Sequence, residues 1–211
     1  KYMERLIGLK STEYEHPADK AALEKLRNST VFKTLMTEFI HQGVERIYRI
    51  QYTGSSLKIK KQDYPEIYKA LENAGAALGM QELPALYLQY YYAINAFTTG
   101  KKEPLVVVYS GTIDLLEEDE LQYIIGHELG HILSDHVLYH MMVQGLVDFI
   151  NLPAKDLIEL PLYYWSRMSE LTADRAGLLA CQDLNTAIRA MIKMAGLPQS
   201  QYDRINVQAF I

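Results

Sequence analysis

Apolar residues recur at helical spacing through the N-terminal part of the chain. A helical pattern begins at Pro17, which suits a first helical turn, and continues to about Asn28. Ser29 or Thr30 would cap a second helix. The apolar face of that helix carries Phe32, Leu35, Met36 and Phe39. These patterns predict a helical N-terminal portion over residues 1–43.

The middle of the chain has the alternating pattern that is typical of strands. Residues 44–52 (VERIYRIQY) alternate and are rich in β-branched and aromatic residues, so we expect a strand there. A turn over residues 54–56 would lead into a short partner strand at Leu57–Ile59. The tyrosine-rich residues 84–96 predict another strand, and the apolar run Leu105–Tyr109 predicts a buried one.

Along the sequence, one helix is predicted before the last two strands and one after them. Asp63 and Glu66 fit a capping box, which would start a helix that ends near Gly79. A cluster of acidic residues at 117–120 suits the N-terminus of a helix, and we expect that helix to run to about His140.

Two more helices complete the pattern. One is expected over residues 162–181, and the last from Asp183 to Gly196. The order is thus helices, a small sheet and helices again, which is typical of an α+β fold.

The composition is that of an ordinary globular protein of one domain. Hydrophobic residues make up 49% and charged residues 22% of the 211 residues, which is enough apolar material for one core. We expect a single domain over 1–211, with a catalytic core at 44–196 after the helical portion and a tail at 197–211. The net charge of -5 argues against nucleic acid as a partner, because nucleic-acid-binding faces are usually basic.

The single cysteine, Cys181, excludes an internal disulfide and favours a reducing compartment, so we expect a cytoplasmic protein. We interpret Cys181 as a small buried apolar residue rather than as a reactive thiol. The longest uncharged stretch, residues 83–100, is interrupted by Pro84 and by polar residues, and it is a poor membrane span. Because the sequence begins at Lys1 rather than at methionine, we interpret it as a trimmed piece, which leaves open the membrane association of a longer chain.

Residues 127–131 carry the candidate chemistry. Their sequence, HELGH, fits H-E-x-x-H inside a predicted helix with apolar flanks. Residues four apart on a helix point in nearly the same direction, so His127 and His131 can present imidazole nitrogens to one metal ion. Glu128 lies beside the first ligand and can reach a water on that metal. Two histidines on a solvated helix face are the alternative interpretation, because a catalytic zinc site needs a third protein ligand.

A later predicted helix offers that third ligand. Glu170 and Asp174 are four residues apart and share a helix face. Taken alone they fit an exposed acidic face, but together with the two histidines Glu170 would close a His-His-Glu zinc site. Asp174 would then accept the outer N–H of a ligand histidine and fix its tautomer.

The other histidines are expected to be structural. His136 follows His131 by five residues, which on a continuous helix turns it away from the metal, so we predict a hydrogen-bonded structural residue. His16 and His41 are predicted to lie at the surface. Most of the 16 tyrosines are expected at the core edge and in the sheet. A tyrosine-lined substrate groove around residues 87–92 is the weaker alternative.

Together these motifs resemble the gluzincin metallopeptidases of the HtpX and CaaX-prenyl-protease type. The resemblance rests on HELGH at 127–131, on SELTADRAG at 169–177, and on the stretches 95–97, 105–111 and 115–121 that precede the first motif. It implies a zinc-dependent endopeptidase with one zinc ion per chain. It also implies a zincin-like fold, in which a small mixed sheet packs on the active-site helix and on a second, Glu-bearing helix. Without transmembrane helices, the chain is most similar to the soluble, compact branch.

The resemblance also implies how a substrate would bind. A peptide or an unfolded protein would lie extended along the edge strand, where Asn95 would bind its backbone. Glu128 would take a proton from the attacking water and pass it to the leaving amine. The donor to the oxyanion stays open among Tyr202, Arg204, His140 and Tyr139.

Two alternatives to an active endopeptidase remain. One is a zinc-bound but catalytically silent module that binds proteins or acts like a chaperone. The other is a latent enzyme, in which the N-terminal portion or the C-terminal tail occupies the groove. The unassigned oxyanion donor and the unmatched N-terminal helices motivate the silent module.

Overall fold

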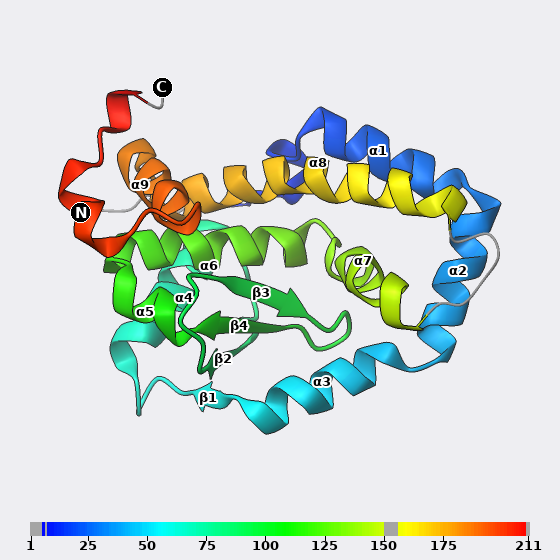
Figure 1. Ribbon diagram of the computed structural model, residues 1–211, viewed down its shortest axis with the longest axis horizontal. Helices are drawn as coiled ribbons and strands as arrows, with labels where there is room; N and C mark the ends of the chain where they lie inside the picture. Colours follow the sequence, from blue (N-terminus) through cyan, green and yellow to red (C-terminus); the bar gives the residue numbers. More distant parts are fainter. Residues whose placement is uncertain (1–5, 7, 150–155, 210–211) are drawn as a thin grey trace.

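A four-stranded sheet lies at the centre of the fold, with helices on both of its faces (Figure 1). The computed structural model describes residues 6, 8–149 and 156–209. The strands are β1 (Leu57–Ile59), β2 (Ala85–Gln89), β3 (Ala96–Thr99) and β4 (Leu105–Tyr109), in the order β1-β2-β4-β3. β2 and β4 run parallel and the two outer pairs run antiparallel, so the sheet is mixed and β3 is an edge strand. The helices and the small sheet together form an α+β fold, as predicted.

The side chains of β4 point alternately to the two faces of the sheet, and both faces are apolar. Three helices cover these faces: α3 (Val44–Ser55), α4 (Pro65–Ala77) and α6 (Glu118–Leu133). Val106 and Val108 belong to the core that includes α4 and α6. Leu105 and Val107 belong to the opposite face, where Tyr52 of α3 packs against them. Because both faces are buried, the strand is apolar at successive positions rather than at alternate ones.

Two long helices, α6 and α8 (Asp156–Cys181), pack along each other, and α6 lies between α8 and the sheet (Figure 1). Gly126 and Gly130 of α6 face the methyl groups of Ala180 and Ala176 of α8, and a Cβ atom at either glycine would overlap them. The lack of a side chain at these two positions lets the two backbones approach closely. Polar side chains from the two helices can therefore meet.

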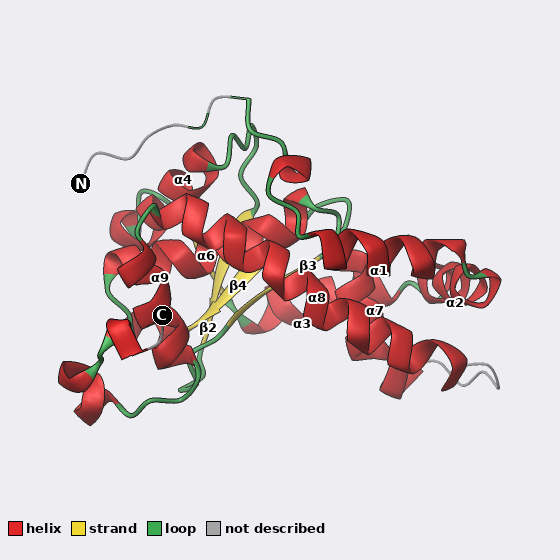
Figure 2. Cartoon of the chain, turned by 90° about the horizontal axis from the view of Figure 1, so that it is seen from above, coloured by secondary structure: helices red, strands yellow, loops and turns green. Residues whose placement is uncertain are grey.

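A second apolar core lies beyond the sheet. It is built by α1 (Pro17–Asn28), α2 (Thr30–His41), α7 (Val137–Phe149) and the first half of α8. Trp165 is fully buried in it, and Ile132 near the end of α6 packs against both cores. Figure 2 shows these helices extending the molecule to one side of the sheet. The junction between α6 and α7 therefore lies where the two cores meet, while the division of the chain at residue 43 stays a prediction.

The remaining described elements are short, and most follow α8. They are η1 (Ser11–Glu13), α5 (Ser110–Leu115), α9 (Leu184–Met194), η2 (Gln199–Arg204) and η3 (Val207–Ala209). A buried ion pair joins α9 to the start of α6, with Lys193 Nζ 2.6 Å from Glu120 Oε2. This pair fixes the N-terminal end of α6, while Ile132 fixes the other end.

The predicted strand at residues 44–52 is wrong, because these residues form α3. Tyr48 and Tyr52, one helical turn apart, have their rings in contact, and Tyr52 packs on the sheet. Ile47 and Ile50, two of the β-branched residues that favoured a strand, are exposed. A short amphipathic run fits both periods, and the packing of Tyr52 on the sheet selects the helical one.

Three predicted boundaries also differ from the structure. The strand expected at residues 84–96 splits into β2 and β3, which are joined by a turn. The helix expected to continue to His140 ends before Asp135, whose φ of 58° lies in the left-handed region and interrupts the helical hydrogen bonds. The capping box at Asp63 is absent, and α4 has Tyr64 as an N-cap without a side-chain hydrogen bond.

The other predicted elements are confirmed. Ser29 caps α2 by accepting the N–H of Phe32, and Asp183 caps α9 by accepting the N–H of Thr186. Cys181 is buried, as expected. No helix among the described residues is long and apolar enough to cross a membrane. Parts of the predicted N-terminal portion and C-terminal tail, residues 1–5, 7, 210 and 211, lie outside the described residues.

Replacing Gly126 by alanine should destabilise the fold. The new methyl group would overlap Ala180, so we expect the free energy of unfolding to fall by about 1–3 kcal/mol. Gly54→Ala is the matched control, because nothing lies within 4 Å of a Cβ atom at this position of α3, and its stability should stay the same or rise by about 0.5 kcal/mol. Urea denaturation measures both. Equal stability of the two variants would contradict a tight crossing of α6 and α8.

Candidate metal centre

Helix α6 presents the HELGH motif to a cavity of about 400 Å³. The acidic stretch starts this helix as predicted, with Glu117 as its N-cap. His127 and His131, one turn apart, line the cavity together with Glu128. His131 and Glu128 are each only 6% exposed. The apolar flanks of the motif are packed in the core, so the polar face of the helix is the one directed into the cavity.

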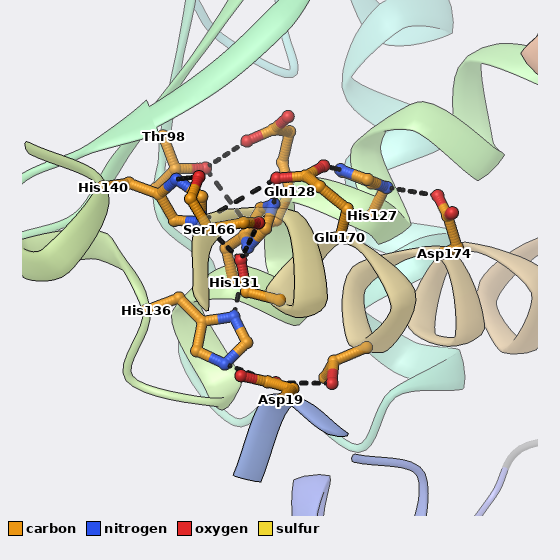
Figure 3. Close-up of polar contacts among 12 residues, drawn as sticks. Asp19, Thr98, His127, Glu128, His131, His136, His140, Ser166, Glu170 and Asp174 are labelled. Atoms are coloured by element: carbon orange, nitrogen blue, oxygen red, sulfur yellow. Dashed lines mark hydrogen bonds and ion pairs between the residues drawn. The ribbon is translucent and has the colours of Figure 1, made fainter. Parts of the chain in front are cut away.

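Helix α8 brings Glu170 against both histidines (Figure 3). His127 Nε2 lies 3.2 Å from Glu170 Oε2, and His131 Nε2 lies 3.7 Å from Glu170 Oε1. One ligand atom from each of the three residues lies within 4.8 Å of the other two. Bonds of about 2.0–2.1 Å in a tetrahedral zinc site separate the ligand atoms by about 3.3 Å, so this spacing fits one zinc-sized ion.

Asp174, one turn after Glu170, contacts the outer side of His127. Its Oδ1 atom lies 3.0 Å from His127 Nδ1 and accepts a hydrogen bond from the hydroxyl of Tyr123, also at 3.0 Å. Burial disfavours the charged form of His127, but its hydrogen bonds to Asp174 and Glu170 outweigh burial and raise its pKa to about 10. The raised pKa shows an excess of negative charge around this ring, which a metal cation would neutralise.

Glu128 points away from the three candidate ligands, toward the edge strand (Figure 3). Thr98 of β3 donates a hydrogen bond from Oγ1 to Glu128 Oε2 at 2.8 Å. Burial raises the pKa of Glu128, although the nearby His127 and the bond from Thr98 act in the opposite direction. The carboxylate is thus held on the β3 side of the cavity, where a substrate backbone is expected.

The turn at Asp135 brings His140 back into the same cavity. His140 Nε2 lies 2.9 Å from Ser169 Oγ and 3.8 Å from Glu170 Oε1. Burial lowers the pKa of His140 to about 4, so its imidazole is neutral near pH 7. Burial likewise lowers the pKa of His131, and the neighbouring His140 adds to this effect.

His136 lies behind His131 rather than in the cavity. Its Nδ1 atom lies 3.2 Å from His131 Nδ1, and its Nε2 atom lies 3.1 Å from Asp19 Oδ2 on α1. Burial alone would raise the pKa of Asp19, but hydrogen bonds from His136, Thr172 and Trp165 outweigh burial and lower it. His136 thus has the hydrogen bonds expected of a structural residue, although the helix break, and not rotation along one helix, determines its position.

The remaining candidate residues are dispersed. Asn95 lines the cavity directly before the edge strand β3. Tyr202 lies on η2 with its ring centroid 4.4 Å from Lys193 Nζ, and Arg204 is exposed. Tyr139 is buried in the second core. Of the four oxyanion candidates, His140 is the one that lines the cavity.

The structure agrees only in part with the predictions for the two surface histidines and for a tyrosine-lined groove. His41 is exposed, but His16 is half-buried and accepts the N–H of Ala18 as the N-cap of α1. The tyrosines at residues 90–92 are exposed, and Tyr123 is the one tyrosine of the described residues that lines the cavity. The cavity is therefore lined mainly by histidines, carboxylates and apolar side chains.

Comparison with known proteins finds a family whose profile covers the HELGH motif. Residues 61–154 match the profile of peptidase family M48. The protein named "Plastoglobule-localized metallopeptidase 48, chloroplastic" from Arabidopsis thaliana is 32% identical over 212 residues, which cover 96% of this chain and 61% of that protein. The chain is therefore similar in sequence to peptidase family M48.

Bacterial proteins match this chain over shorter stretches. "Protease HtpX homolog" from Tropheryma whipplei (strain Twist) is 32% identical over 97 residues, 45% of this chain and 33% of that protein. The protein of the same name from Dictyoglomus thermophilum is 29% identical over 146 residues, 67% of this chain and 48% of that protein. The chain thus spans less than two thirds of the length of these M48 relatives. No solved structure matches it.

Two residues of this site could not be found from the sequence. Thr98 belongs to a segment with no feature that points to Glu128, and only the packing of β3 beside α6 brings them together. Asp19 reads as an ordinary acidic residue in the first turn of a helix. Its contact with His136 depends on the fold and has no local signal.

Zinc should stabilise this chain only when the candidate cluster is intact. Binding to the folded state raises the free energy of unfolding by about 2.7 kcal/mol when free zinc is about 100 times the Kd. We expect this increase in the unmodified protein but not in His127→Ala or Glu170→Ala, measured as a shift in thermal unfolding. His41→Ala removes an exposed histidine outside the cavity and is the control. A shift that survives His127→Ala would mean that the metal binds elsewhere.

Proposed function

We propose that this chain is a zinc-dependent endopeptidase with a zincin-like arrangement. The observation that carries the proposal is a His-His-Glu cluster and a separate buried carboxylate in one cavity. His127, His131 and Glu170 offer the ligand atoms, and Glu128 lies beside them without belonging to the cluster. The match to peptidase family M48, and relatives named as a metallopeptidase and as proteases, support the same chemistry.

We assign the three residues to one zinc ion per chain. Two imidazole nitrogens and one carboxylate oxygen form the ligand set of many catalytic zinc sites, which keep a fourth position open. A bound zinc ion lowers the pKa of a water molecule and polarises the scissile carbonyl. Asp174 keeps the proton of His127 on Nδ1, so that Nε2 is available as a ligand.

Glu128 acts as the general base in this proposal. Burial raises the pKa of its carboxyl, which brings the group closer to the range in which a base is effective near neutral pH. Thr98 holds Oε2 from the edge strand and leaves Oε1 to accept the proton of the attacking water. The same carboxyl then passes the proton to the leaving amine.

A peptide or an unfolded protein would bind along β3. This strand has a sheet neighbour on one side only, so its outer backbone groups can pair with an extended segment. Asn95 lines the cavity at the start of the strand and would bind a backbone group of the substrate. Met191 and Met194 of α9 also line the cavity and offer an apolar surface to substrate side chains.

His140 is the oxyanion donor that we favour. It lines the cavity beside Glu170, and a neutral imidazole has one N–H group. His140 Nε2 lies 2.9 Å from Ser169 Oγ, and we propose that this N–H turns to the oxyanion when a substrate is bound. Tyr202 and Arg204, which lie on η2, and Tyr139, which lies in the second core, are not among the residues that line the cavity.

The lining of the cavity favours an active enzyme over a latent or silent module. Among the described residues, those that line it lie between Asn95 and Met194, and none comes from the predicted N-terminal portion or the C-terminal tail. We therefore propose that the N-terminal helices support the domain and do not block its groove. The cytoplasmic location stays a prediction, since the name of the plant relative refers to the chloroplast.

Glu128→Gln should abolish proteolysis and keep zinc. The amide has nearly the same shape but cannot accept the proton, so cleavage of a fluorescently labelled unfolded casein should slow by about 10²–10⁴-fold. Glu118→Gln, the same change at an exposed position of α6, should leave cleavage unchanged. Zinc bound by the unmodified protein without any cleavage would favour the silent module and contradict the proposal.

His140→Phe should lower kcat by about 10²–10³-fold with little change in KM, because the N–H donor acts on the transition state. His140→Gln places an amide N–H near the position of Nε2 and should recover part of the loss. Steady-state kinetics with a quenched fluorescent peptide separate the two constants. An increase in KM alone would assign His140 to substrate binding.

A further inference from the structure

Behind the proposed metal cluster, a chain of hydrogen bonds leads to the N-terminal helix (Figure 3). His131 Nδ1 lies 3.2 Å from His136 Nδ1, and His136 Nε2 lies 3.1 Å from Asp19 Oδ2 on α1. Asp19 and His136 are each only 1% exposed. Burying an imidazole and a carboxylate is costly unless their hydrogen bonds are satisfied, and the proposed peptide hydrolysis uses neither group directly.

These contacts allow one placement of protons when His131 is a metal ligand. Its Nε2 atom faces Glu170 and binds the metal, so the proton of the neutral ring is on Nδ1. The partner of this N–H is Nδ1 of His136, which must then carry no proton. The proton of His136 is therefore on Nε2, from which it is donated to the carboxylate of Asp19.

Both oxygens of Asp19 are held as acceptors. Trp165 donates from Nε1 to Oδ1 at 2.9 Å, and Thr172 donates from Oγ1 to Oδ2 at 2.6 Å. An indole N–H can only donate, so a second donor at the position of Oδ1 would have no acceptor there. Asp19 is thus built to accept from His136 and not to donate to it.

We infer that Asp19 and His136 are positioning residues for the proposed metal ligand His131. They fix the tautomer and the orientation of its ring, as Asp174 does directly for His127. The inference rests on the metal site of the proposed function. It extends that site to α1, which is distant in the sequence from both motifs.

A second cation among the histidines is the competing interpretation. One ligand atom each of His131, His136 and His140 also lies within 4.8 Å of the others. The hydrogen bonds favour the positioning role, because both ring nitrogens of His136 already face a partner, His131 on one side and Asp19 on the other. This group of three also includes no carboxylate to balance the charge of a second cation.

Asp19→Asn tests the acceptor role. If the amide keeps its oxygen toward Trp165, its NH₂ group faces Nε2 of His136, which must then carry no proton. The proton of His136 would be on Nδ1, where it would face the N–H group of His131. With the amide turned over, the NH₂ group would face the indole N–H. Two donors meet in either arrangement, so we expect the zinc affinity of the variant, measured by competition with a chromogenic chelator, to fall about 10–100-fold.

Trp165→Phe provides the matched rescue. Without the indole N–H, the amide in Asp19→Asn can turn its oxygen toward His136. We therefore expect Asp19→Asn combined with Trp165→Phe to bind zinc as tightly as Trp165→Phe alone. A merely structural role for Asp19 would instead make the two defects add, and this result would overturn the inference.

The unmodified zinc-bound protein allows a test without any variant. Nitrogen-15 NMR should show His136 protonated at Nε2 and unprotonated at Nδ1. The opposite tautomer, two zinc ions per chain, or an unchanged zinc affinity in Asp19→Asn would overturn the inference and leave the proposed function standing. If the unmodified protein binds no zinc, the proposed function fails first, so the two failures are distinguishable.

Discussion

The close approach of α6 and α8 is the constraint on which the site depends. The candidate ligands come from both helices, and an imidazole and a carboxylate can share one ion only when the backbones that carry them are close. Gly126 and Gly130 permit this approach, since alanine methyl groups of α8 occupy the space where their side chains would be. The buried pair of Lys193 and Glu120 holds one end of α6, and Ile132 holds the other end between the two cores.

The charges of the site show why a cation suits it. Glu128 and Glu170 lie in one cavity with histidines whose rings are largely buried, and unpaired buried charges are costly. The carboxylates raise the pKa of His127 to about 10, whereas burial lowers the pKa of His140 to about 4. A divalent ion between the two helices would take over the positive charge that His127 otherwise supplies. The carboxylates thus make the cavity negatively charged, and the imidazoles around them can serve as neutral metal ligands.

The sequence predicts the parts of the fold that have local causes. Leu105–Tyr109 is apolar at successive positions because both faces of the sheet are covered, and Ser29 caps a helix with its own side chain. The strand predicted at residues 44–52 was wrong. The sequence there fits both the period of a strand and that of a helix, and the contact of Tyr52 with the sheet favours the helix. Spacing within each helix was enough to propose the ligands. Asp19 and the turn at Asp135 were not predictable, since each acts through residues that only the tertiary structure brings near.

The turn at Asp135 makes the segment between the HELGH motif and His140 a spacer of fixed length. Each residue of an α-helix advances the direction of its side chain by about 100°. His136 directly precedes α7 and His140 lies in its first turn, so one residue more or less before α7 would shift both histidines relative to His131 while the motif itself stayed intact. The number of residues between the motif and these two histidines is therefore part of what the site requires.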